Sequence, residues 1–155
     1  MKKKLRYILD KVNTDYIILI IIAIILAIPM FSQKLDVYAD DGIQHIARAF
    51  GTYETIKEGV LPKIISSFTN GYGYSWDLFY GPFTAFGIII MQIFTKSWVN
   101  AYKLFCFILL ILSGIFMYIF VYKLSENKKT GLLSGSLYMT FPYHLTDLYI
   151  RNAIR

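Results

Sequence analysis

The sequence has few of the residues that build most catalytic and metal sites in soluble proteins. Its 155 residues include one cysteine, two histidines and ten acidic side chains. The single cysteine, Cys106, excludes an internal disulfide and a cysteine-based metal site. The chain also lacks a phosphate-binding loop, a zinc-protease motif and a nucleophile elbow. Basic residues outnumber acidic ones instead, and the net charge is +6.

Apolar residues are abundant, at 56% of the chain, and they gather in blocks. A soluble domain has about 45–50% apolar residues, usually spread over one core. Separate apolar blocks are typical of membrane spans. We therefore expect an all-α integral membrane protein whose first partner is the lipid bilayer. Lysines cluster beside the blocks, at Lys2–Lys4 and Lys128–Lys129. Such clusters indicate membrane topology and anionic lipid headgroups, and we expect no nucleic-acid partner.

The apolar blocks and the basic clusters together predict three spans, at residues 16–31, 101–122 and 131–146. A span needs roughly 20 predominantly apolar residues. Because basic residues stay on the cytoplasmic side, residues 1–15 and the turn at 123–130 should be cytoplasmic. No small-x-small cleavage site follows the first block, which favours an uncleaved anchor over a signal peptide. The protein is thus expected to be multi-pass in the plasma membrane, with a cytoplasmic amino terminus.

A fourth apolar block, at 78–94, is predicted not to cross the membrane. If it crossed, the lysine-rich turn at 123–130 would lie outside, against the positive-inside rule. Gly81 and Pro82 also suit a re-entrant or juxtamembrane helix that packs against protein. This block would then belong to a long outer loop at 32–100.

The same outer loop contains a predicted amphipathic helix at 42–58. Apolar residues such as Ile43 and Phe50 recur along one helical face. Asp41 and Gln44 form a capping-box pattern at its start. One apolar and one polar face suit a helix that lies on the membrane surface.

The first candidate site consists of Asp40, Asp41, His45 and Arg48. The last three are spaced to share one face of the helix. A carboxylate there can hold a divalent cation or act as a general base, and a neighbouring histidine and arginine can hold a phosphate. The plain alternative is that the two acids only cap the helix, while His45 and Arg48 form its solvated face.

The second candidate site is an aromatic segment rich in glycine, running from Asn70 to Trp76 and on to Pro82. Its candidate binding residues are Tyr72, Tyr74, Trp76 and Tyr80. Glycine lets the backbone turn tightly or approach a ligand, and aromatic rings can stack on a sugar or grip a lipid chain. The alternative is an interfacial aromatic belt on a tight turn.

The third candidate site lies at the outer end of the last predicted span, where a second outer loop at 147–155 begins. It contains Tyr143, His144, Asp147 and Arg151. Asp147 and Arg151 are four residues apart, so they are also spaced to form a simple ion pair. The last residues are predicted to begin another amphipathic helix, and we expect this chain to be the amino-terminal part of a longer protein.

The order and spacing of these motifs resemble a known family. The motifs are Asp41-Gly-x-x-His45-x-x-Arg48, Gly59-x-x-Pro62, Asn70-Gly-Tyr-Gly-Tyr followed by Phe79-Tyr80-Gly-Pro82, and Tyr143-x-Leu-x-Asp147-Leu-Tyr-x-Arg151. They look like those of bacterial membrane proteins described as 6-pyruvoyl-tetrahydropterin synthase-related. That family is in turn similar to the GT-C glycosyltransferases, multi-span enzymes that use polyprenyl-phosphate sugars.

The resemblance implies a fragment of a GT-C-like helical bundle, with juxtamembrane helices and an essential acid in the first outer loop. By position this acid would be Asp41, with Asp40 beside it, and Asp147 would be the acid nearest the second loop. The implied function is sugar transfer from a polyprenyl phosphate at the outer face of the bacterial cell envelope.

The implied site has three groups of residues. Asp41 and Asp40 would be catalytic, Asp41 and Asp147 would hold a divalent cation such as Mg or Mn, and the substrate would contact His45, Arg48, Tyr72, Tyr74, Trp76, Tyr80 and Arg151. This part alone is not expected to be active without the remainder of its own chain. The alternative function is a non-enzymatic membrane protein that aids lipid or polysaccharide export or assembly.

Overall fold

The computed structural model describes residues 14–32, 41–65 and 68–152, and these are helical apart from turns and one isolated β-bridge. The helices are α2 (Thr14–Ser32), α3 (Gly42–Lys57), η1 (Thr69–Gly71), α4 (Trp76–Phe79), α5 (Phe83–Thr95), α6 (Trp98–Ser125), α7 (Lys128–Thr140), α8 (Pro142–Thr146) and η2 (Asp147–Arg151). The all-α class predicted from the sequence is confirmed for the described residues.

The chain divides into two compact units. The first, which we call the α2–α7 unit, contains described residues 14–32 and 107–146. The second, the α3–α5 unit, contains described residues of 41–106 together with 147–152. Helix α6 begins in the α3–α5 unit and ends in the α2–α7 unit.

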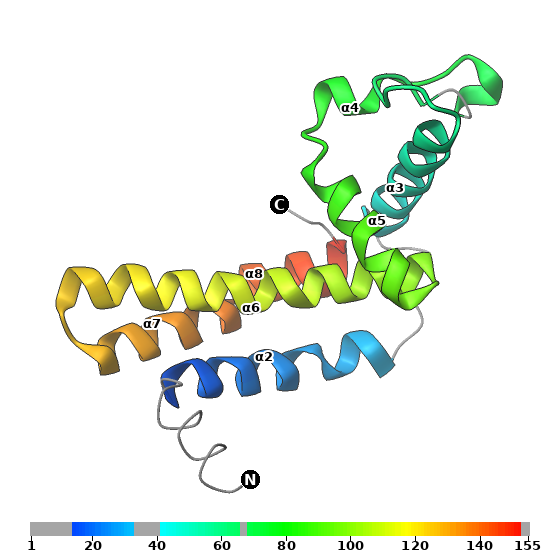
Figure 1. Ribbon diagram of the computed structural model, residues 1–155. Coiled ribbons are helices and arrows are strands. Elements are labelled where there is room, and N and C mark those ends of the chain that lie inside the picture. Colours follow the sequence, from blue (N-terminus) through cyan, green and yellow to red (C-terminus); the bar gives the residue numbers. More distant parts are fainter. Residues whose placement is uncertain (1–13, 33–40, 66–67, 153–155) are drawn as a thin grey trace, which may run out of the picture. The chain divides into compact units, whose positions relative to one another are not determined.

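Close approach of helices holds the α2–α7 unit together, with α7 beside α2 and α6 (Figure 1). A Cβ atom on Gly135 of α7 would lie 2.7 Å from the Gly114 carbonyl oxygen of α6 and 3.2 Å from Leu19 of α2. A Cβ atom on Gly131 would lie 3.0 Å from the Tyr118 carbonyl oxygen. Glycines therefore let the backbones meet, as in small-residue packing between membrane helices.

Two of the described helices, α2 and α6, are long and apolar enough to cross a membrane. In the most apolar stretch of each helix, only 22% of the residues of α2 and 28% of those of α6 are buried within the structure. Large side chains such as Ile25, Ile28 and Phe116 are each about 60% exposed. A core helix of a soluble protein would bury most of these groups, so this exposure supports membrane association.

The third predicted span, 131–146, is not a single long helix. Helix α7 ends at Thr140, Phe141 is extended with ψ of 132°, and Pro142 starts α8. Proline disfavours the helical conformation in the residue before it, which explains the break. The structure therefore gives two candidate spans among its described residues, where the sequence predicts three.

The predicted non-crossing block at 78–94 is also divided. Its first residues end α4, a turn follows at Tyr80–Pro82, and the rest forms most of α5. Helix α5 has 13 residues, so it is about 20 Å long, and it is shorter than a hydrocarbon core of about 30 Å.

Small residues let α5 pack against α3 within the α3–α5 unit (Figure 1). Ala49 and Thr52 of α3 and Ala85 and Ile88 of α5 are fully or almost fully buried. Helix α3 covers nearly the same range as the predicted helix at 42–58. This pair of helices is the platform on which the candidate site is built.

Candidate functional site

Asp41 precedes the first residue of α3, but its side chain makes no capping hydrogen bond. The capping-box prediction for Asp41 and Gln44 is therefore wrong. The Asp41 carboxylate instead lies 3.6 Å from the Arg151 guanidinium. The Asp41 backbone N–H also donates to the Arg151 carbonyl at 3.0 Å. A carboxylate that is 41% exposed is thus fixed to a segment far away in the sequence.

Arg151 lies between two acids. Its guanidinium is also 3.3 Å from the carboxylate of Asp147, one turn earlier in η2. The predicted pairing of Asp147 with Arg151 is confirmed, and Asp147 is only 7% exposed. Burial of a carboxylate is tolerated because the arginine compensates its charge. The structure therefore brings together one residue from the first candidate site and two from the third.

His45 lies one turn after Asp41 and stacks on Tyr102, with 6.4 Å between ring centroids and 17° between planes. The Tyr102 hydroxyl donates to the Asn152 carbonyl, which follows Arg151 directly. Burial lowers the pKa of His45 from its usual 6.5; Asp41 opposes this change, and Arg48 adds to it. His45 is consequently neutral near pH 7, so it offers a hydrogen bond and not a charge.

Arg48 has a different role from the one that its spacing suggests. It is 2% exposed, and it donates to the Tyr80 and Gly81 carbonyls at 2.9 and 2.8 Å. It also donates to Thr84 at 3.4 Å, and its guanidinium lies 5.9 Å from the Tyr80 ring centroid. Arg48 therefore fixes the turn between α4 and α5 against α3.

The aromatic segment is fixed to α3 at a second point. Ile65 and Tyr74 exchange two backbone hydrogen bonds, of 3.0 and 3.1 Å, and so close a loop. Ile65 is fully buried, and a Cβ atom on Gly51 of α3 would lie 2.5 Å from it. Within the loop, Gly71 and Gly73 have φ of 91° and 81°, values that favour glycine. The glycines of this segment thus serve the loop geometry.

Between these two attachment points lies a cavity of about 440 Å³. Residues from α3, the loop and α4, together with the turn after α4, line it: Gln44, Ala47, Phe68, Thr69, Tyr74, Trp76 and Tyr80. The rings pack edge to face: the Trp76 ring centroid lies 5.5 Å from that of Tyr74 and 6.4 Å from that of Tyr80. No lining side chain is charged.

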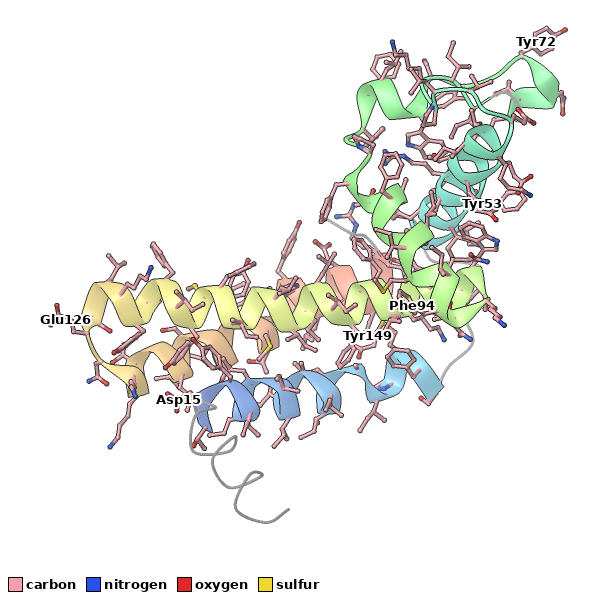
Figure 2. The ribbon with its side chains drawn as sticks, viewed as in Figure 1. Asp15, Tyr53, Tyr72, Phe94, Glu126 and Tyr149 are labelled. Atoms are coloured by element: carbon pink, nitrogen blue, oxygen red, sulfur yellow. The ribbon has the colours of Figure 1, made fainter. Side chains whose placement is uncertain are left out.

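Three of the four predicted aromatic residues, Tyr74, Trp76 and Tyr80, therefore line one cavity. The fourth, Tyr72, is 90% exposed and projects from the tip of the loop (Figure 2). Sequence reasoning missed Gln44 and Thr69 as lining residues, since Gln44 has the spacing of a helix cap and Thr69 precedes the motif. The predicted catalytic Asp40 lies outside the described residues.

The metal site predicted at Asp41 and Asp147 stays a prediction. Asp41 and Asp147 are both engaged by the same arginine, Arg151. Among residues 14–32, 41–65 and 68–152, no group of three or more His, Cys, Asp or Glu side chains is arranged to hold a metal ion. The cluster thus consists of two carboxylates and one guanidinium.

No protein-family model matches the chain, and no solved structure matches it. The chain is similar to an uncharacterized protein of Lactococcus lactis subsp. cremoris (strain MG1363), with 31% identity over 128 residues. The match covers 79% of this chain and 21% of that protein. The chain thus spans about a fifth of the length of the relative.

Proposed function

We propose that this chain is part of a bacterial plasma-membrane glycosyltransferase of GT-C type, which uses a polyprenyl-phosphate sugar at the outer membrane face. The observation that carries the proposal is the pairing of Asp41 with Arg151 in the α3–α5 unit. It joins an acid from the first predicted outer loop to a basic residue from the second. A half-exposed carboxylate beside a guanidinium suits a reaction that moves a proton next to a phosphate.

In the proposed reaction, Arg151 binds the donor phosphate and Asp41 acts as general base. The acceptor hydroxyl oxygen attacks the anomeric carbon of the sugar, and its proton passes to the Asp41 carboxylate. The bond between the anomeric carbon and the phosphate oxygen breaks, and polyprenyl phosphate leaves with the bonding electrons. Once Asp41 has taken up the proton and lost its charge, Arg151 can stabilise the charge of the leaving phosphate.

The charge pattern supports the proposed location. With α2, α6 and the broken α7–α8 segment as spans, residues 1–13 and the Lys123–Lys129 region lie on the cytoplasmic side, and both are rich in lysine. The α3–α5 unit then lies outside. There α5 does not cross, since one more crossing before α6 would place the lysine-rich turn outside.

The proposal predicts that Asp41→Asn abolishes sugar transfer while the protein still inserts into the membrane. Loss of a general base typically reduces the rate by about 10²–10⁴-fold. The measurement is transfer from a radiolabelled polyprenyl-phosphate sugar in membranes of cells that carry the full-length gene. The matched control is Glu54→Gln, because Glu54 is an acid of the same helix and pairs with nearby Lys57.

Transfer retained in Asp41→Asn membranes, with Glu54→Gln equally active, would contradict the proposal. Wild-type membranes that transfer none of the tested donors, in cells whose envelope polymers change on deletion, would instead favour the export or assembly function.

A further inference from the structure

We infer that the cavity between α3 and the aromatic loop, which is closed by Ile65 and Tyr74 and continues to Tyr80, binds an uncharged sugar ring. The inference rests on the proposed function only for the reaction in which this sugar takes part; the site itself follows from the geometry. The cavity volume, about 440 Å³, falls in the usual range of about 300–1,000 Å³ for small-ligand sites.

The chemistry of the lining favours a carbohydrate. Tyr74, Trp76 and Tyr80 offer aromatic surface on which the C–H face of a sugar can pack. Gln44 and Thr69 offer an amide and a hydroxyl, which can both donate to and accept from sugar hydroxyls. This combination of apolar rings with a few polar groups is typical of sites that orient a small polar ligand.

The absence of charge among the lining side chains argues against a phosphate in this cavity. The nearest basic side chain along α3 is Arg48, and its guanidinium donates to the Tyr80 and Gly81 carbonyls behind the wall. A neutral ring therefore fits better than the phosphate of a lipid carrier. In the proposed function, the phosphate of the lipid carrier binds to Arg151, which lies outside this cavity.

The position of the cavity argues against a lipid chain. All of its lining residues lie between α2 and α6, outside both candidate spans. The loop that forms one wall projects from the unit at its tip, since Tyr72 is 90% exposed. The amide of Gln44 and the hydroxyl of Thr69 interrupt the apolar lining, which suits a sugar ring better than a hydrocarbon chain.

The walls are fixed before any ligand arrives. Because Gly51 has no side chain, Ile65 and Phe68 approach α3 closely, and the loop packs on this helix at one end of the cavity. Arg48 fixes the Tyr80 turn at the other end. A ligand that meets a formed cavity does not have to order the loop, which favours binding. Arg48 and Gly51 are therefore positioning residues for this site.

The test is binding of methyl glycosides of glucose, galactose and N-acetylglucosamine to the full chain in lipid nanodiscs, by saturation-transfer NMR titration. We expect at least one glycoside to bind. Trp76→Ala should weaken its binding by about tenfold, which is equivalent to about 1.4 kcal/mol, because the sugar ring loses an aromatic surface. Gln44→Leu, an exposed position on α3, should also weaken it and does not threaten folding.

Phe79→Ala is the control, because Phe79 is a 78% exposed aromatic residue of α4 that does not line the cavity. The Phe79→Ala variant should bind the glycoside as tightly as the wild type does. Absence of binding by all three glycosides, or equal binding in all variants, would overturn the inference. Binding of farnesyl phosphate that is lost in Trp76→Ala, with no glycoside bound, would overturn it in favour of a lipid site.

The two proposals fail separately. Sugar binding that survives Asp41→Asn, in membranes where this variant still transfers sugar, would overturn the catalytic role and support the cavity. Loss of transfer in Asp41→Asn, with no glycoside bound to the wild type, would overturn the cavity and support the catalytic role.

Discussion

Arg48 differs from both expectations that the sequence raises for it. Its spacing from Asp41 and His45 suits a shared polar face, and a free guanidinium there would suit a phosphate. In the structure it is almost fully buried, and carbonyl oxygens of the Tyr80 turn accept its hydrogen bonds. A buried guanidinium without such acceptors would be strongly destabilising. The turn and the arginine therefore depend on each other.

His45 allows a prediction about pH. Because burial lowers the pKa of His45 below 6.5, the unfolded chain binds more protons than the folded chain below that pH. Stability rises with pH wherever the unfolded state binds more protons. The free energy of unfolding should therefore fall as the pH drops through 6.5 towards the lowered pKa of the folded state.

The measurement is thermal unfolding in detergent between about pH 7.5 and about pH 5.5, on either side of the usual histidine pKa. Between these two pH values, the melting temperature of His45→Gln should fall by less than that of the wild type. His144→Gln leaves His45 in place and should behave as the wild type does. An equal loss in the wild type and His45→Gln would contradict the prediction.

Helix α7 shows what small residues do at the scale of an element. Gly131 and Gly135 are one turn apart and face the same neighbours, so α7 approaches α6 backbone to backbone. The sequence contains the pair, and such pairs occur often by chance. In the structure the pair lies at a helix contact, because a Cβ atom on either glycine would lie 3.0 Å or less from a carbonyl oxygen of α6.

Gly135→Ala therefore has two opposing effects. In a free helix the change would stabilise by about 0.8–1 kcal/mol. Here the new Cβ would lie 2.7 Å from the Gly114 oxygen, a backbone atom that cannot rotate away. Overpacking of this kind costs about 1–3 kcal/mol, so we expect a net loss of stability of up to about 2 kcal/mol.

Thermal unfolding of the chain in nanodiscs measures this effect. The control is Leu137→Ala on the same helix, where the side chain is 57% exposed, and it should change stability by less than about 0.5 kcal/mol. A Gly135→Ala variant more stable than the wild type would show that α6 and α7 do not approach so closely.

At the scale of the whole molecule, the proposed topology places the aromatic loop and the lysine-rich turn on opposite sides of the membrane. Single cysteines test it. In a Cys106→Ala background, Tyr72→Cys should react with a membrane-impermeant maleimide added to intact cells. Lys129→Cys should react only after the membrane is permeabilised. Both positions are exposed, so access to water does not limit labelling.

Labelling of Lys129→Cys in intact cells would contradict the topology, because α6 would then run outward. The Cys106→Ala protein without an added cysteine is the control for background reaction. Cys106 is 6% exposed, and the chain has no other cysteine.

The sequence by itself determined the features that depend on local order and composition. Apolar runs set α2 and α6, because about 20 apolar residues in succession can span a bilayer without any partner. Helical spacing predicted α3, whose observed bounds nearly match the expected ones. The four-residue spacing of Asp147 and Arg151 likewise anticipated their ion pair.

Only the tertiary structure decided which of these features meet. Asp41 pairs with Arg151 across the length of the chain, Arg48 fixes a turn, and Gln44 lines a cavity. These results depend on how α3 packs on α5 and on the loop, where a single glycine, Gly51, admits Ile65. Spacing along one helix cannot specify such contacts, because the partner atoms come from segments whose separation is fixed only by packing.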